Sequence, residues 1–300
     1  MPTRMIYKNT RANRMQSTNG RPTSGHCVEC GRITSMADGG KRVTIPSQKN
    51  GVWMCADHRG TKNLNSYFYE NDKRLGKGNA DNISISLELE SMGCSTHARA
   101  YLVNNGFVAT SDSTVDVEYK SPIYTSELPL AKIVGGIEYM DKNPNYRFSV
   151  NNENCGIHTH YGFTDNHFDF TSLDEYYSEL FEELDEVVCD MTYEQKMQVF
   201  GRDFQRYNCE CDFNCPTEHG NWINIQHRYS LEIRMPRFVS AVQYMRFLKC
   251  FKKVFKALDT HYISKEHNRR NAEKAGHKMA LVFKKSYKEI FYPNTLERAA

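Results

Sequence analysis

The stretch Asn154-Cys155-Gly156-Ile157-His158-Thr159-His160-Tyr161-Gly162-Phe163 is the segment around which the predicted fold is organised. If it is a β-strand, His158 and His160 lie on the same face, because side chains alternate between the two faces of a strand. Two imidazoles on one sheet face can contact a metal ion, a phosphate group or a substrate. Taken alone, the pattern favours a hydrogen-bonded structural pair, and other strands are needed to assign it a function.

A second strand is predicted over residues 83–90, where apolar and polar residues alternate without interruption. Glu88 and Glu90 share its polar face near the end of the strand. Two carboxylates about 7 Å apart on one face repel each other unless a cation lies between them. The pair is therefore a candidate Mg²⁺ site, and the simpler alternative is a polar face exposed to solvent.

A third strand, predicted over residues 229–236, carries Glu232 and Arg234 on one face, and a fourth, over residues 115–120, carries Glu118. An arginine beside a glutamate is either a plain ion pair or a metal-binding carboxylate next to a phosphate-binding guanidinium. If these strands are neighbours, their carboxylates, imidazoles and arginine suit a site for ATP and Mg²⁺. Such a site is not a P-loop, and the chain contains no G-x-x-x-x-G-K-[ST] motif.

Helices are predicted between and after these strands, from apolar residues that recur at helical spacing. In the segment over residues 126–143, Leu128 is among the residues expected to face inward, and Gly135-Gly136 is expected to allow close packing. The remaining predicted elements are helices over residues 95–105, 172–191, 193–200, 240–262 and 269–291, and strands over residues 107–110 and 221–225.

The composition limits the class of protein. The 300 residues, 39% hydrophobic and 25% charged, are enough for one large domain or two ordinary ones. The mean hydropathy is −0.67, and no apolar run approaches the roughly 18 residues that span a bilayer. No secretory signal is recognised and there are ten cysteines, so we expect a cytoplasmic protein without a membrane segment. The net charge of +3 is too small to indicate nucleic-acid binding by itself.

Residues 25–60 have the cysteine and histidine spacing of a small zinc ribbon. A C-x2-C pair and a C-x2-H pair flank a polar spacer in which residues 43–45 are a candidate strand. Structural zinc takes four such ligands, and a segment this short depends on the metal for its folding energy. The alternative is a set of unrelated thiols. The expected structural Zn²⁺ ligands are Cys27, Cys30, Cys55 and His58.

The flanking segments differ in composition from the centre of the chain. Residues 1–24 are polar and basic and are predicted to be a flexible arm, and residues 60–80 are predicted to be a linker. Residues 266–300 are predicted to be a basic C-terminal helix that packs on or extends the preceding domain. Near residue 210, a group of thiols and an imidazole is either a second metal cluster or a loop that covers a substrate: Cys209, Cys211, Cys215 and His219.

Five short pieces of the chain are similar, in this order, to motifs of one known family. They are Leu87-Glu88-Leu89-Glu90; Asp112-Ser113 before Glu118-Tyr119-Lys120-Ser121-Pro122; Cys155-Gly156-Ile157-His158-Thr159-His160; Gly201-Arg202 before Tyr207-Asn208-Cys209; and Leu231-Glu232-Ile233-Arg234 before a long helix. Over residues 80–265 the chain therefore resembles the amidoligases, carboxylate–amine ligases with a glutamine-synthetase-like fold. Each piece is unspecific by itself, whereas their order and spacing together are fairly specific.

The resemblance implies an α+β fold, in which helices pack on one face of a mostly antiparallel, glutamine-synthetase-like sheet, with the zinc ribbon in front. It also implies an ATP-dependent ligase, in which ATP phosphorylates a carboxylate and an amine then attacks the acyl phosphate. The partners would be a carboxylate and an amine, including those of a peptide or a protein.

The same resemblance implies roles for individual residues. The expected Mg²⁺ ligands are Glu88, Glu90 and Glu232. The expected ATP-binding residues are His158, His160, Arg202 and Arg234. Glu118 and Glu232 would complete the shell around the metal and the amine, and Arg234 would neutralise charge on the transferred phosphoryl group. Glu118, Glu232 and Arg234 are thus the expected catalytic residues.

Two other functions remain open from the sequence. The first is a catalytically inactive ligase scaffold that binds nucleic acid or a protein through the zinc ribbon and the basic ends of the chain. The second is a zinc-dependent hydrolase that uses His158 and His160, which would need a third ligand near them, and the chain contains no H-E-x-x-H motif.

Overall fold

The protein is described by a computed structural model that covers residues 83–93, 96–110, 115–163, 168–204, 210–216 and 220–293, and five N-terminal strands. These strands are β1 (Ser24–His26), β2 (Ile33–Ser35), β3 (Lys41–Ile45), β4 (Gln48–Met54) and β5 (Arg74–Leu75). β1 pairs with β2 and β3 with β4, each antiparallel, and β3 contains the predicted strand over residues 43–45. The following predictions lie outside the described residues: the arm up to residue 23 and the zinc ligands Cys27, Cys30, Cys55 and His58.

The chain divides into two compact units whose segments alternate along the sequence. Unit 1 comprises Met1–Arg74, Leu87–Ile123 and Tyr139–Cys155, and unit 2 comprises Leu75–Ser86, Tyr124–Glu138 and Gly156–Ala300. The strand β6 (Ile83–Ser91) and the helix α4 (Glu127–Lys142) each begin in unit 2 and end in unit 1. Unit 2 therefore contains residues from both of the predicted segments 80–265 and 266–300.

Three antiparallel strands form the centre of the described part of unit 1. The end of β6 pairs with β8 (Val117–Lys120), and β8 pairs with β7 (Val108–Thr110). The helix α3 (Thr96–Asn104) leads into β7 through Gly106, whose φ of 96° is a conformation that glycine adopts at little cost. The helix and the two strands predicted between residues 95 and 120 are therefore confirmed. A short 3-10 helix, η2 (Pro144–Tyr146), lies near α3.

Unit 2 contains a second set of antiparallel strands. β10 (Ile157–Phe163) pairs with β12 (Leu231–Ile233), and β12 pairs with β11 (Ile223–Asn224). In addition, β9 (Ile123–Tyr124) pairs through Tyr124 with Ile85 of β6. One face of the β10–β12–β11 set is apolar and buried, and its side chains are Tyr161, Ile223, Leu231 and Ile233.

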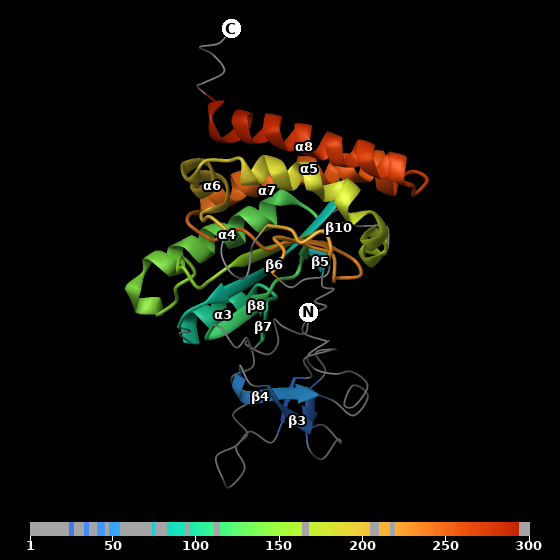
Figure 1. Ribbon diagram of the computed structural model, residues 1–300. Coiled ribbons are helices and arrows are strands. Elements are labelled where there is room, and N and C mark those ends of the chain that lie inside the picture. The colour runs from blue at the N-terminus through green and yellow to red at the C-terminus, as the bar shows by residue number, and fades with distance from the viewer. Residues whose placement is uncertain are drawn as a thin grey trace. The chain divides into compact units, whose positions relative to one another are not determined.

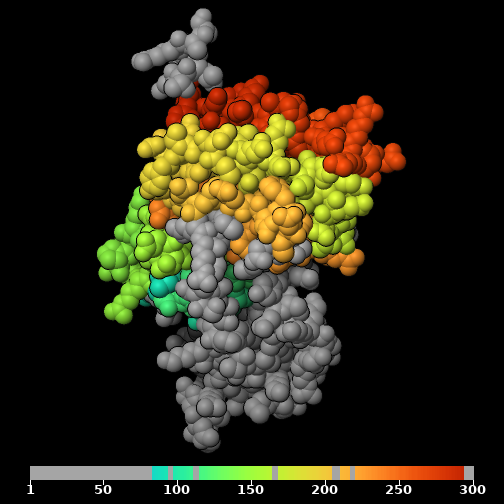
Figure 2. Space-filling view, viewed as in Figure 1, coloured from blue at the N-terminus to red at the C-terminus, as the bar shows by residue number. Residues whose placement is uncertain are grey.

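Three helices cover this apolar face: α5 (Tyr177–Cys189), α7 (Ala241–Leu258) and α8 (Arg269–Phe291). Phe181, Phe255 and Met279, one from each helix, line the same small cavity as the strand residues, and the Tyr161 ring stacks on Phe255. α8 lies against both α5 and α7 (Figure 1), and its surface, in red, adjoins the yellow surface of the α5–α6 region in Figure 2. Gly276 permits this contact, because a Cβ atom there would collide with the carbonyl of Glu179 in α5.

The ends of the helices in unit 2 carry local sequence signals. The predicted helix over residues 172–191 begins as a 3-10 helix, η3 (Phe170–Tyr176), before α5. Thr192 and Gln195 form a capping box at the start of α6 (Tyr193–Phe200), and Ser240 caps α7. α7 ends in a π-helical turn, η4 (Asp259–Ile263), and α8 spans residues 269–291 as predicted.

Some expectations from the sequence are wrong. Leu128 was expected to face inward but is 82% exposed, and a Cβ atom on Gly135 would contact nothing, so no close packing occurs there. The strand predicted over residues 229–236 is shorter as an assigned strand, β12, although Arg234 N still donates to the Trp222 carbonyl at 2.8 Å and the Pro236 carbonyl accepts from Ile157 N at 2.9 Å. Glu88 and Glu90 are both buried, so the alternative of a solvent-exposed polar face on β6 is also wrong.

The predicted fold class is confirmed at the level of a mixed α+β protein with antiparallel strands. Among the described residues, no helix combines the length and the apolar character needed to cross a membrane.

Candidate functional site

Two clusters of charged side chains lie on the polar faces of the strands, one in each unit. The Glu232 cluster, in unit 2, consists of His158, His160, His227, Glu232 and Arg234. The Lys120 cluster, in unit 1, consists of Glu88, Glu90, Thr110, Glu118 and Lys120. Each cluster contains residues that the sequence predicted and one cationic or imidazole residue that it did not.

The register of the strands assembles the Glu232 cluster. His160 of β10 lies opposite Glu232 of β12, which in turn lies opposite Asn224 of β11. Because side chains alternate, the residues between them point to the helices: the Thr159 hydroxyl lies 2.7 Å from the hydroxyl of Tyr244 in α7. The pairing of residues two apart, predicted for His158/His160 and for Glu232/Arg234, thus places all four on one face.

The carboxylate of Glu232 is the centre of this cluster. Arg234 Nη1 donates a hydrogen bond to Oε1 at 2.9 Å, and His158 Nδ1 lies 3.2 Å from the same oxygen. His227 Nε2 lies 3.4 Å from Oε2. Only 1% of the Glu232 side chain is exposed. An unpaired charge at this depth would cost several kcal/mol, so the surrounding nitrogen groups are what keep the carboxylate ionised.

The pKa of Glu232 reflects this competition. Burial raises the pKa of the carboxyl, but the Arg234 guanidinium and the hydrogen bonds from His158 and His227 outweigh burial and hold the pKa well below its usual range. Glu232 is therefore an anion at neutral pH and a weak base. It can accept hydrogen bonds from a cationic or amine group, whereas taking up a proton is unfavourable.

His227 is the member of this cluster that the sequence reasoning missed. It lies in the connection between β11 and β12, outside any strand, so the alternation of strand residues gave no signal for it. Its ring meets that of His160 edge to face with centroids 4.7 Å apart, and a ring nitrogen of each lies within 4.8 Å of the other. Gly162 allows the connection to pass over β10, because a Cβ atom there would lie 2.7 Å from the carbonyl oxygen of Tyr229. The same connection brings Ser230 Oγ to 3.2 Å from His160 Nδ1.

The Lys120 cluster is assembled in the same way in unit 1. Glu88 lies opposite Lys120 and Glu90 opposite Glu118 across β6 and β8, and Thr110 of β7 lies opposite Glu118. The two carboxylates that were predicted on β6 therefore face a carboxylate and an ammonium group on β8. Lys120 stands two residues after Glu118, so the alternation rule predicts it on the same face, although only Glu118 was singled out.

The ammonium group of Lys120 bridges two carboxylates. Nζ forms an ion pair with Glu88 and lies 3.2 Å from Glu118 Oε2, to which Thr110 Oγ1 also donates at 2.7 Å. Oxygens of Glu88 and Glu118 lie within 4.8 Å of each other. Burial lowers the pKa of Lys120, but the attraction of Glu88 and Glu118 prevails and raises the pKa to about 12. Lys120 is therefore charged at neutral pH and occupies the position of a cation between the two carboxylates.

The donor chemistry of the Lys120 cluster fits Mg²⁺ in part. Three carboxylates on one face supply the hard oxygen ligands that Mg²⁺ prefers. The Lys120 ammonium already neutralises Glu88 and Glu118, so a metal ion would share these oxygens with it. Glu232, the third expected Mg²⁺ ligand, receives nitrogen donors on both of its oxygens. A metal role for Glu232 stays a prediction.

The remaining predicted site residues lie elsewhere. Arg202 is buried directly after α6, and the groups named above around the Glu232 carboxylate do not include it. Cys211 is buried with its Sγ atom 3.3 Å from the Tyr177 hydroxyl, and burial followed by the nearby Asp185 raises the pKa of this thiol. Burial and Asp185 thus favour the protonated form of this thiol. Cys209 and His219 lie outside the described residues.

A scan against protein-family models and a search of curated proteins found no match for this chain. The resemblance to the amidoligases therefore stays a prediction from the motifs.

Proposed function

We propose that the protein is an ATP-dependent carboxylate–amine ligase with a glutamine-synthetase-like fold. ATP would transfer its γ-phosphoryl group to a carboxylate oxygen and release ADP. The amine nitrogen would then attack the acyl carbon, forming the C–N bond, releasing phosphate and losing a proton. The observation that carries the proposal is the buried, ionised Glu232 with Arg234 and two imidazoles on its oxygens.

Arg234 and Glu232 have complementary tasks in this scheme. The guanidinium of Arg234 offers several N–H donors, so it can keep its bond to Glu232 and also contact an oxygen of the transferred phosphoryl group. Because Glu232 is a weak base, its task is to bind and orient the amine rather than to deprotonate it. Imidazoles as a class exchange protons near neutral pH, so His158, His160 and His227 are the candidates to accept the proton of the amine.

The Lys120 cluster would serve the same reaction by holding the cation. Glu88, Glu90 and Glu118 would hold Mg²⁺, which when bound supplies positive charge to the nucleotide phosphates. Lys120 fixes the orientation of two of these carboxylates before any ligand arrives. The N-terminal segment, as a zinc ribbon, would help to bind a macromolecular substrate such as a peptide or a protein.

Nucleotide turnover tests the proposal. Purified protein is incubated with ATP, MgCl₂, hydroxylamine as the amine probe and a panel of carboxylic acids and peptides, and release of ADP and hydroxamate is measured. We expect release that needs both Mg²⁺ and hydroxylamine. Glu232→Gln should reduce it by at least about 100-fold, the range for loss of one preorganised electrostatic group. The matched control is Glu289→Gln, which removes a partly exposed glutamate that pairs with Lys253. Equal activity of both variants, or no Mg²⁺-dependent binding of ATP, would contradict the proposal.

One observation favours a second candidate function. Lys120 places an ammonium group between Glu88 and Glu118, as expected of a ligase scaffold that has lost its metal. The protein would then be an inactive scaffold that binds nucleic acid or a protein through residues 1–60. Binding of labelled RNA or DNA that weakens with salt, disappears when residues 1–60 are removed and persists in Glu232→Gln would support this candidate.

A further inference from the structure

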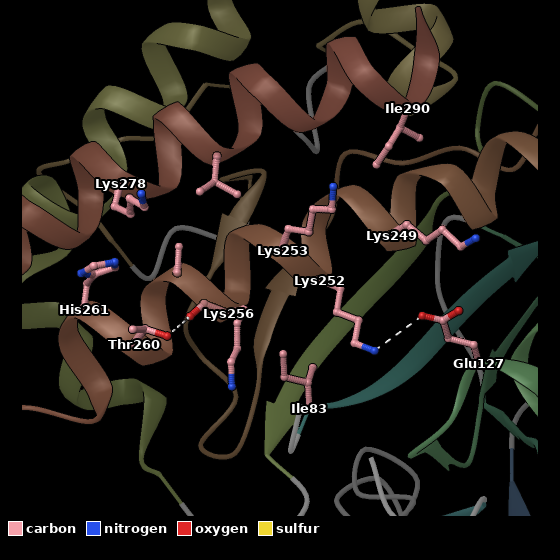
Figure 3. Close-up of a pocket in the computed structure, with 12 residues that line it drawn as sticks. Ile83, Glu127, Lys249, Lys252, Lys253, Lys256, Thr260, His261, Lys278 and Ile290 are labelled. Carbon is pink, nitrogen blue, oxygen red and sulfur yellow. Dashed lines mark hydrogen bonds and ion pairs between the residues drawn. The ribbon is translucent and has the colours of Figure 1, made fainter. Parts of the chain in front are cut away.

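A groove of about 580 Å³ opens along α7 and α8 in unit 2 (Figure 3). Among the described residues, five lysines line this groove: Lys249, Lys252, Lys253, Lys256 and Lys278. Glu127 is the one acidic residue among the groove-lining residues that the structure describes. α7 covers the apolar face of the strands in this unit, whereas Glu232 is on their polar face, so this lysine groove is separate from the Glu232 cluster.

The spacing of the lysines on α7 matches one face of a helix. Lys249, Lys252, Lys253 and Lys256 follow one another at intervals of three, one and three residues, so all four are neighbours over about 10 Å of helix. Figure 3 shows Lys253 extending toward α8, and Lys252 and Lys256 extending to the other side, where Ile83 lies. Ammonium groups therefore lie on both sides of α7, where a ligand that lies along this helix can contact them.

Three of these lysines form ion pairs with described residues that are partly exposed. Lys252 lies 3.5 Å from Glu127, Lys253 lies 3.5 Å from Glu289, and Lys256 lies 3.6 Å from Asp259. At least one member of each pair is well exposed, and such pairs contribute about 0–1 kcal/mol. Neither Lys249 nor Lys278 forms an ion pair with a described residue. Lys249 and Lys278, which are both exposed, are therefore open to a ligand with several negative charges.

The positive field extends to the end of the groove. The pKa of His261 is lowered first by burial and then by the charges of Lys265 and Lys278. His261 lines the groove beside Thr260 (Figure 3). The contribution of the two lysines, though smaller than that of burial, reflects a positive local potential that favours an anion.

The uncharged lining identifies the kind of anion. Apart from Thr260 and His261 it is aliphatic, from Ile83, Ala257, Val282 and Ile290, and no Phe, Tyr or Trp is among the lining residues that the structure describes. Single-stranded nucleic acid is bound mainly by stacking its bases on aromatic rings, and bidentate phosphate recognition uses arginine, which is also missing from this lining. A peptide with acidic and aliphatic residues can supply both kinds of contact, because its carboxylates pair with the lysines and its aliphatic side chains pack on the apolar lining.

We propose that the lysine groove is a docking site for an acidic peptide segment in which carboxylate and aliphatic side chains alternate. In an extended peptide, alternate side chains point to opposite sides and each residue spans about 3.3 Å, so four or so residues match the row of α7 lysines. Acidic side chains contact this row, and aliphatic side chains contact Val282 and Ile290. This proposal does not rest on the ligase proposal, because the groove needs neither ATP nor the Glu232 cluster.

Fluorescence anisotropy tests the docking site. The probe is a fluorescein-labelled peptide of alternating Glu and Leu, about nine residues long, and binding is measured without nucleotide at low salt. The double variant Lys249→Glu/Lys278→Glu should weaken binding at least about tenfold, since like charges then face the peptide. The matched control Lys284→Glu/Lys288→Glu changes the net charge equally, on exposed positions of α8 outside the groove, and should leave the affinity within about twofold.

Three results would overturn the proposal. One is equal weakening by both double variants with unchanged melting temperatures, which would show that net charge alone attracts the peptide. Another is equal binding of a peptide with Gln in place of Glu. The third is tighter binding of a single-stranded oligonucleotide that is lost in Lys249→Glu/Lys278→Glu, which would assign the groove to nucleic acid instead.

Discussion

The Glu232 cluster and the Lys120 cluster are built on the same strand geometry with opposite signs. In unit 2 a buried carboxylate is surrounded by a guanidinium and imidazoles, and in unit 1 a buried ammonium is surrounded by carboxylates. In each cluster the central group keeps its charge because its neighbours outweigh the cost of burial. One face of a few antiparallel strands can thus stabilise a buried charge of either sign.

The difference between the clusters determines what each one attracts. With all groups ionised, three carboxylates and one ammonium give the Lys120 cluster a formal charge of −2, which favours a further cation. In the Glu232 cluster the charges of Glu232 and Arg234 cancel, so protonation of any histidine makes it positive and favours an anion. A pair of sites that attract a metal ion and a phosphate group is what the proposed ligase needs.

The largest effect is expected from removing the centre of the Lys120 cluster. Lys120→Met leaves Glu88 and Glu118 buried without the ammonium that bridges them. Removing one partner of a buried ion pair costs about 3–5 kcal/mol, so the free energy of unfolding in urea should fall by that amount. The control Lys253→Met breaks the partly exposed pair with Glu289 and should cost less than about 1 kcal/mol.

Divalent cations sharpen this prediction. If the carboxylates of the Lys120 cluster accept a metal ion, millimolar MgCl₂ should restore part of the stability of Lys120→Met and leave Lys253→Met unchanged. A loss of stability below about 1 kcal/mol in Lys120→Met would show that the ammonium is not what compensates these carboxylates.

The sequence predicted which residues share a strand face in both clusters. It did not predict the other groups that complete each cluster. Strict alternation over residues 83–90 placed Glu88 and Glu90 together, and the spacing of two placed His158 with His160 and Glu232 with Arg234. Alternation is reliable here because the opposite face is apolar, and a register slip by one residue would move every charge onto that apolar face. It did not predict burial, because burial depends on what lies across from each strand.

The missed residues have different physical causes. Lys120 follows the alternation rule, but a lysine beside glutamates is ordinarily exposed to solvent, whereas here it is buried opposite Glu88. His227 lies in a connection, where no periodicity exists, and its place depends on Gly162 allowing the chain to cross β10. The prediction that Leu128 faces inward was wrong because this residue stands in the first turn of α4, where helical periodicity does not show which residues the rest of the fold covers.

A smaller effect is expected in the pH dependence of stability, with opposite signs for the two clusters. The pKa of Glu232 is lowered on folding, so its stabilisation is complete above about pH 4.5 and is lost as the pH falls through its folded pKa. The pKa of Lys120 rises from 10.5 to about 12, so about 2 kcal/mol is present below pH 10.5 and is lost as the pH approaches 12.

Urea unfolding across pH tests this difference. Glu232→Gln should flatten the acid side of the stability profile, and Lys120→Met should remove the loss of stability between about pH 10.5 and pH 12. Glu289→Gln, with a partly exposed carboxylate, should follow the original protein on both sides. If Glu232→Gln loses as much stability at low pH as the original protein does, other carboxylates must cause most of that loss.

The smallest effects are expected from the hydroxyl groups that hold each cluster. Thr110→Val removes a hydrogen bond of 2.7 Å to the Glu118 carboxylate, and Ser230→Ala removes one of 3.2 Å to the His160 ring. Hydrogen bonds to charged groups are the stronger kind, so we expect about 1.5 kcal/mol of lost stability for Thr110→Val and about 0.5–1 kcal/mol for Ser230→Ala.

Activity distinguishes these two variants further, provided that the ligase proposal holds. Ser230 contacts the His160 ring and would act by orienting it. Ser230→Ala should therefore raise the KM for ATP even under conditions in which the variant stays fully folded. Ser230→Thr keeps the hydroxyl and should restore the KM, whereas a purely structural role of Ser230 would leave the KM of both variants unchanged. If Thr110→Val instead raises the Mg²⁺ concentration needed for half-maximal ADP release, the two clusters differ in function as well as in sign, with the cation bound at one and the phosphate at the other.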